Sequence, residues 1–496
     1  MLTSNGCEEG AEKYGSAASC SHAALYKNAG VDSNALHFKH RAETVELRKK
    51  KRDDGFDRAR RKGVSRGESY EEDSARAVYD PDLISDLLCD DEAKTLNALK
   101  VYSRILSKGP AVEEALEMGL FNTFIDVFMK AEPDSPVERS VVGVLSEMSM
   151  DIRLVASRLN PGPIAKLINC LGSDDPGTCV NALFILEGIV SFDPFKRCTC
   201  DELMILPKAL RLYFRFDQID VKRQTVALIN NYFTFMTPVE ELSDEFLSLY
   251  EFILTNEFDE ILLNEALDTL TGICHFGEEH IQKLIDVGFL SHCSPLLENP
   301  LILPSVLKLA NVIAARPQFL NHLYDSGFFD SALRISQSNA VTPKALGQCF
   351  YLIIQFVKNG VLSHREDVAE QIIDGFLICL RDSTFELRKQ AVSGLYEILN
   401  TKNGNLITMC IKKGLFKGIC DLLTVMSVDV VLQVIDCLSK AMDYGVATGQ
   451  EEEFLAQLEG ANAPDKMDFL MNSQCYDIFK AADAFITKYF DHHNEE

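Results

Sequence analysis

The sequence of 496 residues contains no tryptophan, although it has 30 phenylalanines and 14 tyrosines. A site that needs an aromatic platform must therefore use Phe or Tyr. No apolar run approaches the roughly 18 residues of a membrane span, and the first residues, MLTSNGCEEG, lack the basic and then apolar layout of a secretory signal. We expect a soluble intracellular protein without membrane insertion.

Signatures of catalysis and of metal binding are also missing. No Gly-rich phosphate loop follows an expected strand, HExxH does not occur, and the ten histidines form no cluster beyond the terminal DHHNEE. The fifteen cysteines are scattered without paired CxxC groups, and Cys198-Thr-Cys200 is the only tight pair. We therefore expect no enzyme activity, no cofactor and no metal site, with most cysteines serving as small buried side chains.

Charge is distributed very unevenly along the chain. The formal net charge is −25, yet the segment from Lys39 to Lys62 holds eleven Lys or Arg against five acids, so it carries +6 and the remainder about −31. A body this acidic repels phosphate backbones and favours basic ligands. We expect no direct nucleic-acid binding by the body, and the basic segment should seek an acidic partner or its own body.

A glycine followed by apolar residues at helical spacing recurs along the chain. Successive glycines are separated by 43, 126, 39, 48 and 39 residues, and the long gap holds two similar helices without glycine, at 205–214 and 245–254. The apolar positions fall at i, i+3 and i+4. The pattern predicts about eight helical units of about 42 residues, and the glycines fit tight turns with positive φ: Gly119, Gly162, Gly288, Gly327, Gly375 and Gly414.

A period in the low forties is typical of armadillo and HEAT solenoids. The predicted fold is all-α, an armadillo-repeat, right-handed superhelical solenoid with a flexible basic N-terminal arm. Such an array offers a long groove that suits an extended peptide, so binding is the expected function. The expected organisation is a disordered N-terminus (1–35), a basic arm (36–62), a linker (63–79), armadillo repeats (80–445), C-terminal capping helices (446–490) and an acidic tail (491–496).

Three stretches resemble importin alpha (karyopherin alpha), the adapter family that carries nuclear localisation signals to importin beta. The segment VELRKKKRDDGFDRARRKGVS, which begins at Val45, is similar to the family's importin-beta-binding helix. KKGLFKGICDLLTVMSVDVVLQVIDCLSKAM (412–442) resembles the eighth armadillo repeat, and DKMDFLMNSQCYDIFKAADAFITKYF (465–490) resembles the C-terminal cap. The resemblance covers about residues 37–62 and 80–490.

The resemblance implies that importin beta binds the basic arm. When unpartnered, the arm's Arg60-Arg61-Lys62 cluster would occupy the chain's own cargo groove and cause autoinhibition, because tethering gives it a high effective concentration. The alternatives are a solvated charge run or a nucleic-acid-binding tail. The implied contact residues are Lys39, Arg41, Arg48, Lys49, Lys50, Lys51, Arg52, Arg58, Arg60, Arg61 and Lys62.

The cargo groove departs from the family pattern. In the family, third helices carry Trp-x-x-x-Asn, whose rings hold lysine stems and whose amides hold the peptide backbone. No complete pair survives here. The matching positions are Gly143 and Glu147, Phe184 and Gly188, Val226 and Asn230, Asp268 and Gly272, Leu307 and Asn311, Tyr351 and Gln355, Ser393 and Glu397, and Asp436 and Lys440. The candidate groove residues are Glu147, Phe184, Asn230, Asp268, Asn311, Tyr351, Gln355 and Glu397.

Two functions remain open at this point. The first is a nuclear import adapter that shuttles between cytoplasm and nucleus and binds basic localisation signals in its groove. The second is a divergent armadillo scaffold or regulator that binds importin beta but does not bind ordinary basic nuclear localisation signals. The resemblance of residues 465–490 further implies binding of the recycling exportin together with Ran-GTP, although the same residues could simply form an apolar lid on the last repeat.

Overall fold

A computed structural model describes residues 80–107, 111–149, 155, 158–235, 242–338 and 341–490. These belong to the unit Ser74–Glu496, and the other unit, Met1–Asp73, lies outside the described residues. The expected N-terminus, basic arm, linker and acidic tail therefore lie outside them as well. Every regular element in the described part is helical, and none of its helices is long and apolar enough to cross a membrane.

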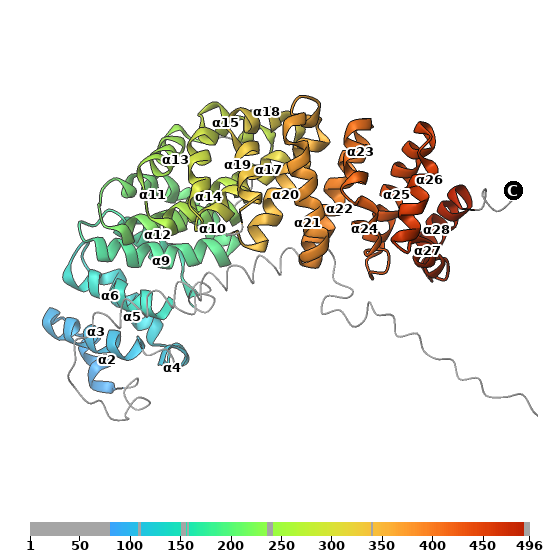
Figure 1. Cartoon of the computed structure of the whole chain (residues 1–496). Coiled ribbons are helices and arrows are strands. Elements are labelled where there is room, and N and C mark those ends of the chain that lie inside the picture. Colours follow the sequence, from blue (N-terminus) through green and yellow to red (C-terminus); the bar gives the residue numbers. More distant parts are fainter. Residues whose placement is uncertain are drawn as a thin grey trace, which may run out of the picture. The chain divides into compact units, whose positions relative to one another are not determined.

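Within the part of the chain that the structure describes, ten helices form one continuous row, in which each helix packs against the next (Figure 1). Their first residues are separated by 40 to 48 residues, in agreement with the expected period. We call this row the third-helix layer: α3 (Glu92–Leu106), α6 (Pro136–Met148), α9 (Pro176–Phe192), α12 (Ile219–Phe235), α14 (Glu260–Cys274), α17 (Leu303–Ala314), α20 (Pro343–Lys358), α22 (Phe385–Asn400), α25 (Val428–Thr448) and α28 (Tyr476–Tyr489).

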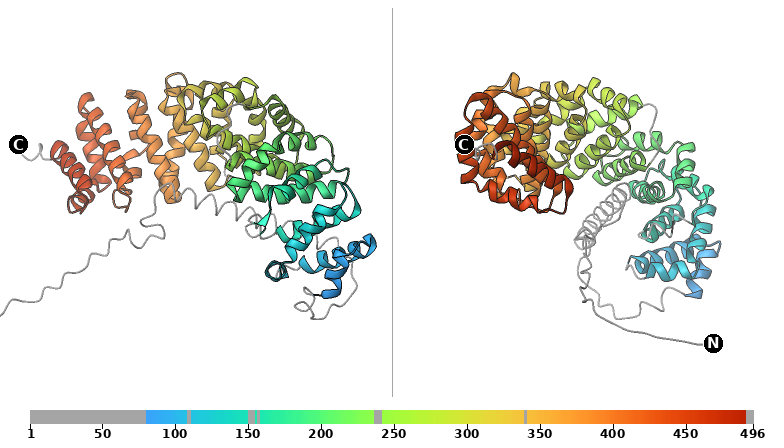
Figure 2. Two further views of the ribbon diagram at one scale, coloured as in Figure 1. Left: turned by 180° about the vertical axis from the view of Figure 1, so that it is seen from behind. Right: turned by 90° about the vertical axis from the view of Figure 1, so that its right-hand side faces the viewer.

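In the described residues, one or two shorter helices precede each member of this layer and pack against it or against a neighbouring helix, and Figure 2 gives further views of the array. They are α2 (Pro81–Leu88), α4 (Ala111–Glu117), α5 (Leu120–Lys130), α8 (Pro161–Cys170), α10 (Pro194–Glu202), α11 (Ile205–Tyr213), α13 (Asp244–Asn256), α15 (Glu278–Asp286), α16 (Phe289–Cys293), α18 (Leu320–Asp325), α19 (Phe328–Ser336), α21 (Ala369–Asp382), α23 (Gly404–Lys412), α24 (Leu415–Cys420), α26 (Glu451–Gly460) and α27 (Ala463–Met471), with 3-10 turns η3 (Ser294–Glu298), η4 (Pro317–Phe319), η5 (Val361–Ser363) and η6 (Glu366–Val368).

Units such as α10–α11–α12 and α23–α24–α25 contain three helices each, and neighbouring units bury their apolar faces against one another. The all-α armadillo-type solenoid predicted from the period is thereby confirmed. Local sequence sets where its long helices begin. Asp91, Ser135, Asp175, Asp259 and Thr342 cap α3, α6, α9, α14 and α20, each accepting a hydrogen bond from a backbone N–H of the first turn.

The recurring glycines divide into two groups. Gly119, Gly288, Gly327 and Gly414 adopt left-handed backbone conformations immediately before α5, α16, α19 and α24, as expected for tight turns. Gly162 and Gly375 instead lie inside α8 and α21, so their spacing marked the units without marking a turn. In the first of the two units that lack the glycine, Met204 takes the left-handed position before α11, with φ 62°.

Replacing Met204 by glycine is expected to stabilise the protein by about 1 kcal/mol, because a left-handed residue with a Cβ costs about 1–2 kcal/mol. The side chain of Met204 is 59% exposed, so little packing is lost. The matched variant is Gly119→Ala, which places a Cβ at φ 78° in open space and should destabilise by a similar amount. Thermal unfolding of both variants checks the pair, and a destabilised Met204→Gly would contradict it.

The cysteines follow the expectation for buried side chains. All thirteen in the described residues are free, ten of them are buried, and Cys198 is exposed. Burial raises the pKa of Cys274 and of Cys349 to about 12, so these thiols stay protonated at neutral pH. No group of three metal-ligating side chains occurs in this part of the chain.

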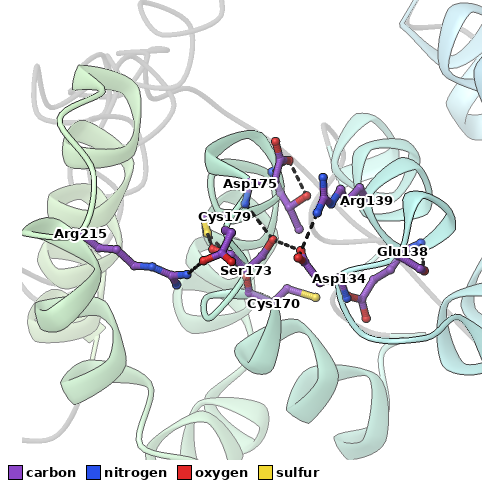
Figure 3. A network of polar contacts seen from close by, with 11 residues as sticks. Asp134, Glu138, Arg139, Cys170, Ser173, Asp175, Cys179 and Arg215 are labelled. Carbon is purple, nitrogen blue, oxygen red and sulfur yellow. Dashed lines mark hydrogen bonds and ion pairs between the residues drawn. The ribbon is translucent and has the colours of Figure 1, made fainter.

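Polar side chains join the loops of adjacent units near the N-terminal end of the array (Figure 3). Asp134, with φ 59°, accepts hydrogen bonds from Ser173 Oγ at 2.5 Å and from Arg139 Nη2 at 3.0 Å. These two bonds, Ser173 first, lower the pKa of the Asp134 carboxyl below its usual range. In the next loop Arg215 pairs with Asp174. The loops before α6, α9 and α12 are thus linked in series.

Candidate functional site

Polar side chains connect neighbouring members of the third-helix layer. The Glu187 carboxylate on α9 accepts hydrogen bonds from Gln224 Nε2 and from Asn231 Nδ2, both on α12, the second at 2.7 Å. Asn230, the residue before Asn231 on α12, donates from Nδ2 to Glu265 Oε2 on α14 at 2.5 Å. Side-chain hydrogen bonds therefore join α12 to both of its neighbours in the layer, and Glu187 is only 6% exposed.

The connection continues on later helices. Lys308 on α17 lies 2.7 Å from the Asp268 carboxylate on α14. Asn311 Nδ2 donates to the backbone carbonyl of Gln348 on α20 at 3.1 Å. Of the candidate groove residues, Asn230, Asp268 and Asn311 thus tie one helix to the next.

The sequence reasoning missed a column of polar residues at one register. Counted from the first residue of each helix, the same position carries a polar side chain from α9 to α25, at intervals of 40 to 43 residues. The signal was present in the period itself, because aligning the units at their helix starts would have shown it. The column consists of Asn181, Gln224, Glu265, Lys308, Gln348, Gln390 and Gln433.

Two positions that would carry tryptophan in the family belong to the core. Val226 and Leu307 are both 0% exposed and pack within the array. A residue there cannot contact a peptide without a rearrangement of the helix. The accompanying Asn230 is 4% exposed, so its amide serves the contact between α12 and α14.

The other candidates are more accessible. Phe184, Gln355, Glu147 and Glu397 are half-buried, and the Tyr351 side chain is 38% exposed. Of these, Tyr351 can present its ring to a ligand.

At the far end of the array, Asp436 and Lys440 on α25 form an ion pair with 2.8 Å between the carboxylate and the ammonium nitrogen. The same nitrogen lies 4.9 Å from the centre of the Tyr396 ring. Burial acts to lower the pKa of Lys440, but the hydrogen bond to Asp436 and the charge attraction of Asp436 together outweigh it, so the pKa is raised. A lysine of the chain itself thus covers the aromatic ring here.

Carboxylates gather on the first half of the third-helix layer. Glu147, Glu187, Glu265 and Asp268, here called the acidic strip, lie on α6, α9 and α14, and Glu187 and Glu265 are both hydrogen-bonded to side chains of α12. Glu265 and Asp268 are three residues apart and so share one side of α14. This arrangement can attract cationic side chains of an extended ligand.

A cleft of about 780 Å³ lies farther along the layer, across α17, α20 and α22. We call it the α17–α22 cleft. Two candidate groove residues, Asn311 and Tyr351, contribute to its lining, and Gln348 and Gln390 of the polar column do so as well. The structure therefore places Asn311 and Tyr351, which lie on the adjacent helices α17 and α20, in the same cleft. Glu147, Phe184 and Glu397 lie outside it.

Neither a protein-family model nor a curated protein sequence matches the chain. Among solved structures, the crystal structure of an engineered protein from a structural genomics consortium is similar over 82% of this chain and 98% of its own length, with a TM-score of 0.65 and 14% identity. At that identity the similarity concerns the fold alone.

Two shorter similarities involve designed proteins. A designed armadillo repeat protein in complex with the peptide (KR)4 matches 50% of this chain and all of its own, with a TM-score of 0.40 and 18% identity. A computationally designed armadillo repeat protein for modular peptide recognition matches 49% of this chain and 99% of its own, with a TM-score of 0.43 and 21% identity.

Proposed function

We propose that this protein is a nuclear import adapter, which binds basic localisation signals of cargo proteins along its third-helix layer and importin beta through residues 36–62. The acidic strip is the observation that carries the proposal, because the negative charge of its carboxylates on three helices of the layer attracts the lysines and arginines of an extended peptide. In this proposal the protein shuttles between cytoplasm and nucleus.

The absence of tryptophan bears on the strength of cargo binding. Losing a Trp platform forfeits about 0.5–2 kcal/mol of cation–π attraction for each lysine. Asn230 and Asn311 already use their amide N–H groups within the array, so they provide fewer hydrogen bonds to a peptide backbone. Each lost hydrogen bond is worth about 1 kcal/mol. Charge attraction by the acidic strip therefore supplies most of the proposed affinity, which should make binding sensitive to salt.

The test is fluorescence anisotropy of a labelled Lys/Arg-rich localisation peptide at near-physiological salt. Residues 71–496 are expected to bind it at least about tenfold more tightly than the full-length chain, because the tethered basic arm competes for the same carboxylates at high effective concentration. Within residues 71–496, Glu265→Gln should weaken binding about two- to fivefold, since it removes one charge while its side-chain oxygen can still accept from Asn230.

The matched control is Glu278→Gln, the same substitution at an exposed position of α15. It should leave the affinity unchanged within about twofold. If neither chain bound the basic peptide while the full-length chain still captured importin beta, the second candidate function, a divergent scaffold that follows importin beta, would replace the adapter.

The C-terminal helices carry the remaining part of the proposal, recycling by an exportin with Ran-GTP. Phe469 on α27 and Tyr476 on α28 are 64% and 71% exposed, so these helices present aromatic side chains to solvent in addition to closing the array. Exposed aromatic side chains are typical of protein interfaces.

A further inference from the structure

The α17–α22 cleft has a charge opposite to that of the chain. Its charged lining residues are Lys308, Arg316 and Lys344, with Glu386 as the single carboxylate. Counting His275 as neutral, the lining carries +2 in a protein of formal net charge −25. A basic peptide, the ligand proposed for the acidic strip, is therefore disfavoured here and an acidic one is favoured.

The positively charged side chains that line the cleft form few ion pairs with carboxylates of the described residues. Lys308 is half exposed and forms an ion pair with Asp268, which lies outside the lining. Arg316 Nη1 donates to the backbone carbonyl of Val312 at 3.0 Å, so a neutral group occupies that donor. Lys344 is exposed in the first turn of α20. Arginine retains further N–H donors for a carboxylate in this setting.

Three amides line the cleft, one from each helix. The side-chain oxygens of Asn311 on α17, Gln348 on α20 and Gln390 on α22 are buried and accept no hydrogen bond from the described residues. Unpaired buried acceptors cost free energy, so a ligand that donates N–H groups would be stabilising. Each amide can also rotate to present its NH₂ group. A peptide backbone offers both donors and acceptors in alternation.

The start of α22 adds a further attraction for negative charge. Thr384 precedes this 16-residue helix and lines the cleft, but its side chain makes no capping hydrogen bond. By contrast, the Thr342 hydroxyl caps α20 by accepting from the Ala345 N–H. The backbone N–H groups in the first turn of α22 thus lack the cap that their counterparts on α20 have, and the helix dipole adds positive potential at that end.

We propose that the α17–α22 cleft binds an extended acidic peptide segment of a partner protein, with its carboxylates at Lys308, Arg316 and Lys344 and its backbone at Asn311, Gln348 and Gln390. Packed helices lie about 8–10 Å apart, so three of them span roughly 20 Å, which corresponds to about six residues of extended chain at about 3.3 Å each. A small carboxylate could not contact all three helices. This site lies on different helices from the acidic strip and takes ligands of the opposite charge.

The experiment measures binding of a fluorescently labelled eight-residue peptide of alternating Glu and Asp to the full-length protein by anisotropy at about 0.15 M salt. A labelled Ser-Gly peptide of equal length is the neutral reference. The acidic peptide is expected to bind at least tenfold more tightly than the neutral one. Lys344→Glu should weaken this binding about tenfold or more, and an acidic residue in the first turn of α20 is compatible with the helix dipole, so folding should be kept.

Lys417→Glu is the matched control, because Lys417 is an exposed residue of α24 outside the cleft and the substitution changes the net charge equally. It should change the affinity less than twofold. Gln348→Leu should weaken binding of the acidic and the neutral peptide by the same factor, because Gln348 is proposed to contact the peptide backbone, which both peptides share. Equal affinity for acidic and neutral peptides, or equal losses with Lys344→Glu and Lys417→Glu, would overturn the proposal. The basic-peptide assay is separate, so either proposal can fail alone.

Discussion

Replacing Phe329 by alanine is expected to lower the free energy of unfolding by about 3–5 kcal/mol, the usual cost of removing a buried aromatic ring. The Phe329 side chain is 0% exposed and lies on α19. Its ring centre is 5.1 Å from that of Phe356 on α20 in an edge-to-face arrangement, and the Arg365 guanidinium lies 5.8 Å from it on another side. The ring of Tyr324 also stacks on Phe329 at 5.9 Å, so the loss combines transferred apolar area, a cavity and three specific ring contacts.

The destabilisation caused by Phe329→Ala should be strongest in the units next to α19, because each unit of a solenoid contacts only its neighbours. Hydrogen exchange is expected to accelerate in α19 and α20 more than in α6 or α9. Phe258→Ala is the matched control: that ring is 89% exposed, and its removal should change stability by less than about 0.5 kcal/mol. Similar losses for both variants in chemical denaturation would show that the described packing of Phe329 is wrong.

Alanine at Gly394 is expected to destabilise the protein by about 1–3 kcal/mol, whereas alanine at Gly272 should stabilise it by about 0.5–1 kcal/mol. Both glycines lie within helices, α22 and α14. A Cβ at Gly394 would have three ring carbons of Phe376 within 2.9 Å, while at Gly272 no atom lies within 4 Å. The same substitution therefore meets a ring at one site and open space at the other.

Phe376 cannot easily yield, because its ring is 1% exposed and packs at 4.9 Å from that of Phe350. An added methyl group must move α22 away from α21 or force the ring off its rotamer. Thermal unfolding of the two variants checks the opposite signs. A stabilised Gly394→Ala would mean that helix propensity outweighs the contact with Phe376.

Much of the fold follows from local sequence. Apolar residues at i, i+3 and i+4, Asp and Ser caps, and a period near 42 fix the helices and their repetition, because each depends on residues close together in the chain. The left-handed turns at Gly119, Gly288, Gly327 and Gly414 belong to the same class. Met204 shows the limit of this local prediction, because it adopts the same left-handed turn although the sequence has no glycine at that position.

The groove could not be assigned in the same way. A family pattern carried over by position placed Val226 and Leu307 where ligand-contacting rings would stand, but both are buried in the core. A shift of one residue rotates a side chain by about 100° around its helix, so small differences in register decide whether it faces the core, a neighbouring helix or solvent. The chain's own amino acids at these positions do not encode that choice locally.

The sequence by itself determined that this protein is an acidic array of helical repeats preceded by a basic segment, because composition and period are properties of the chain alone. Only the tertiary structure decided that Glu187 and Glu265 are joined through α12, and that cations and unpaired amides from α17, α20 and α22 meet in one cleft. Those residues are about 40 positions apart, and the packing of side-chain ridges between helices, rather than any local preference, sets which of them come together.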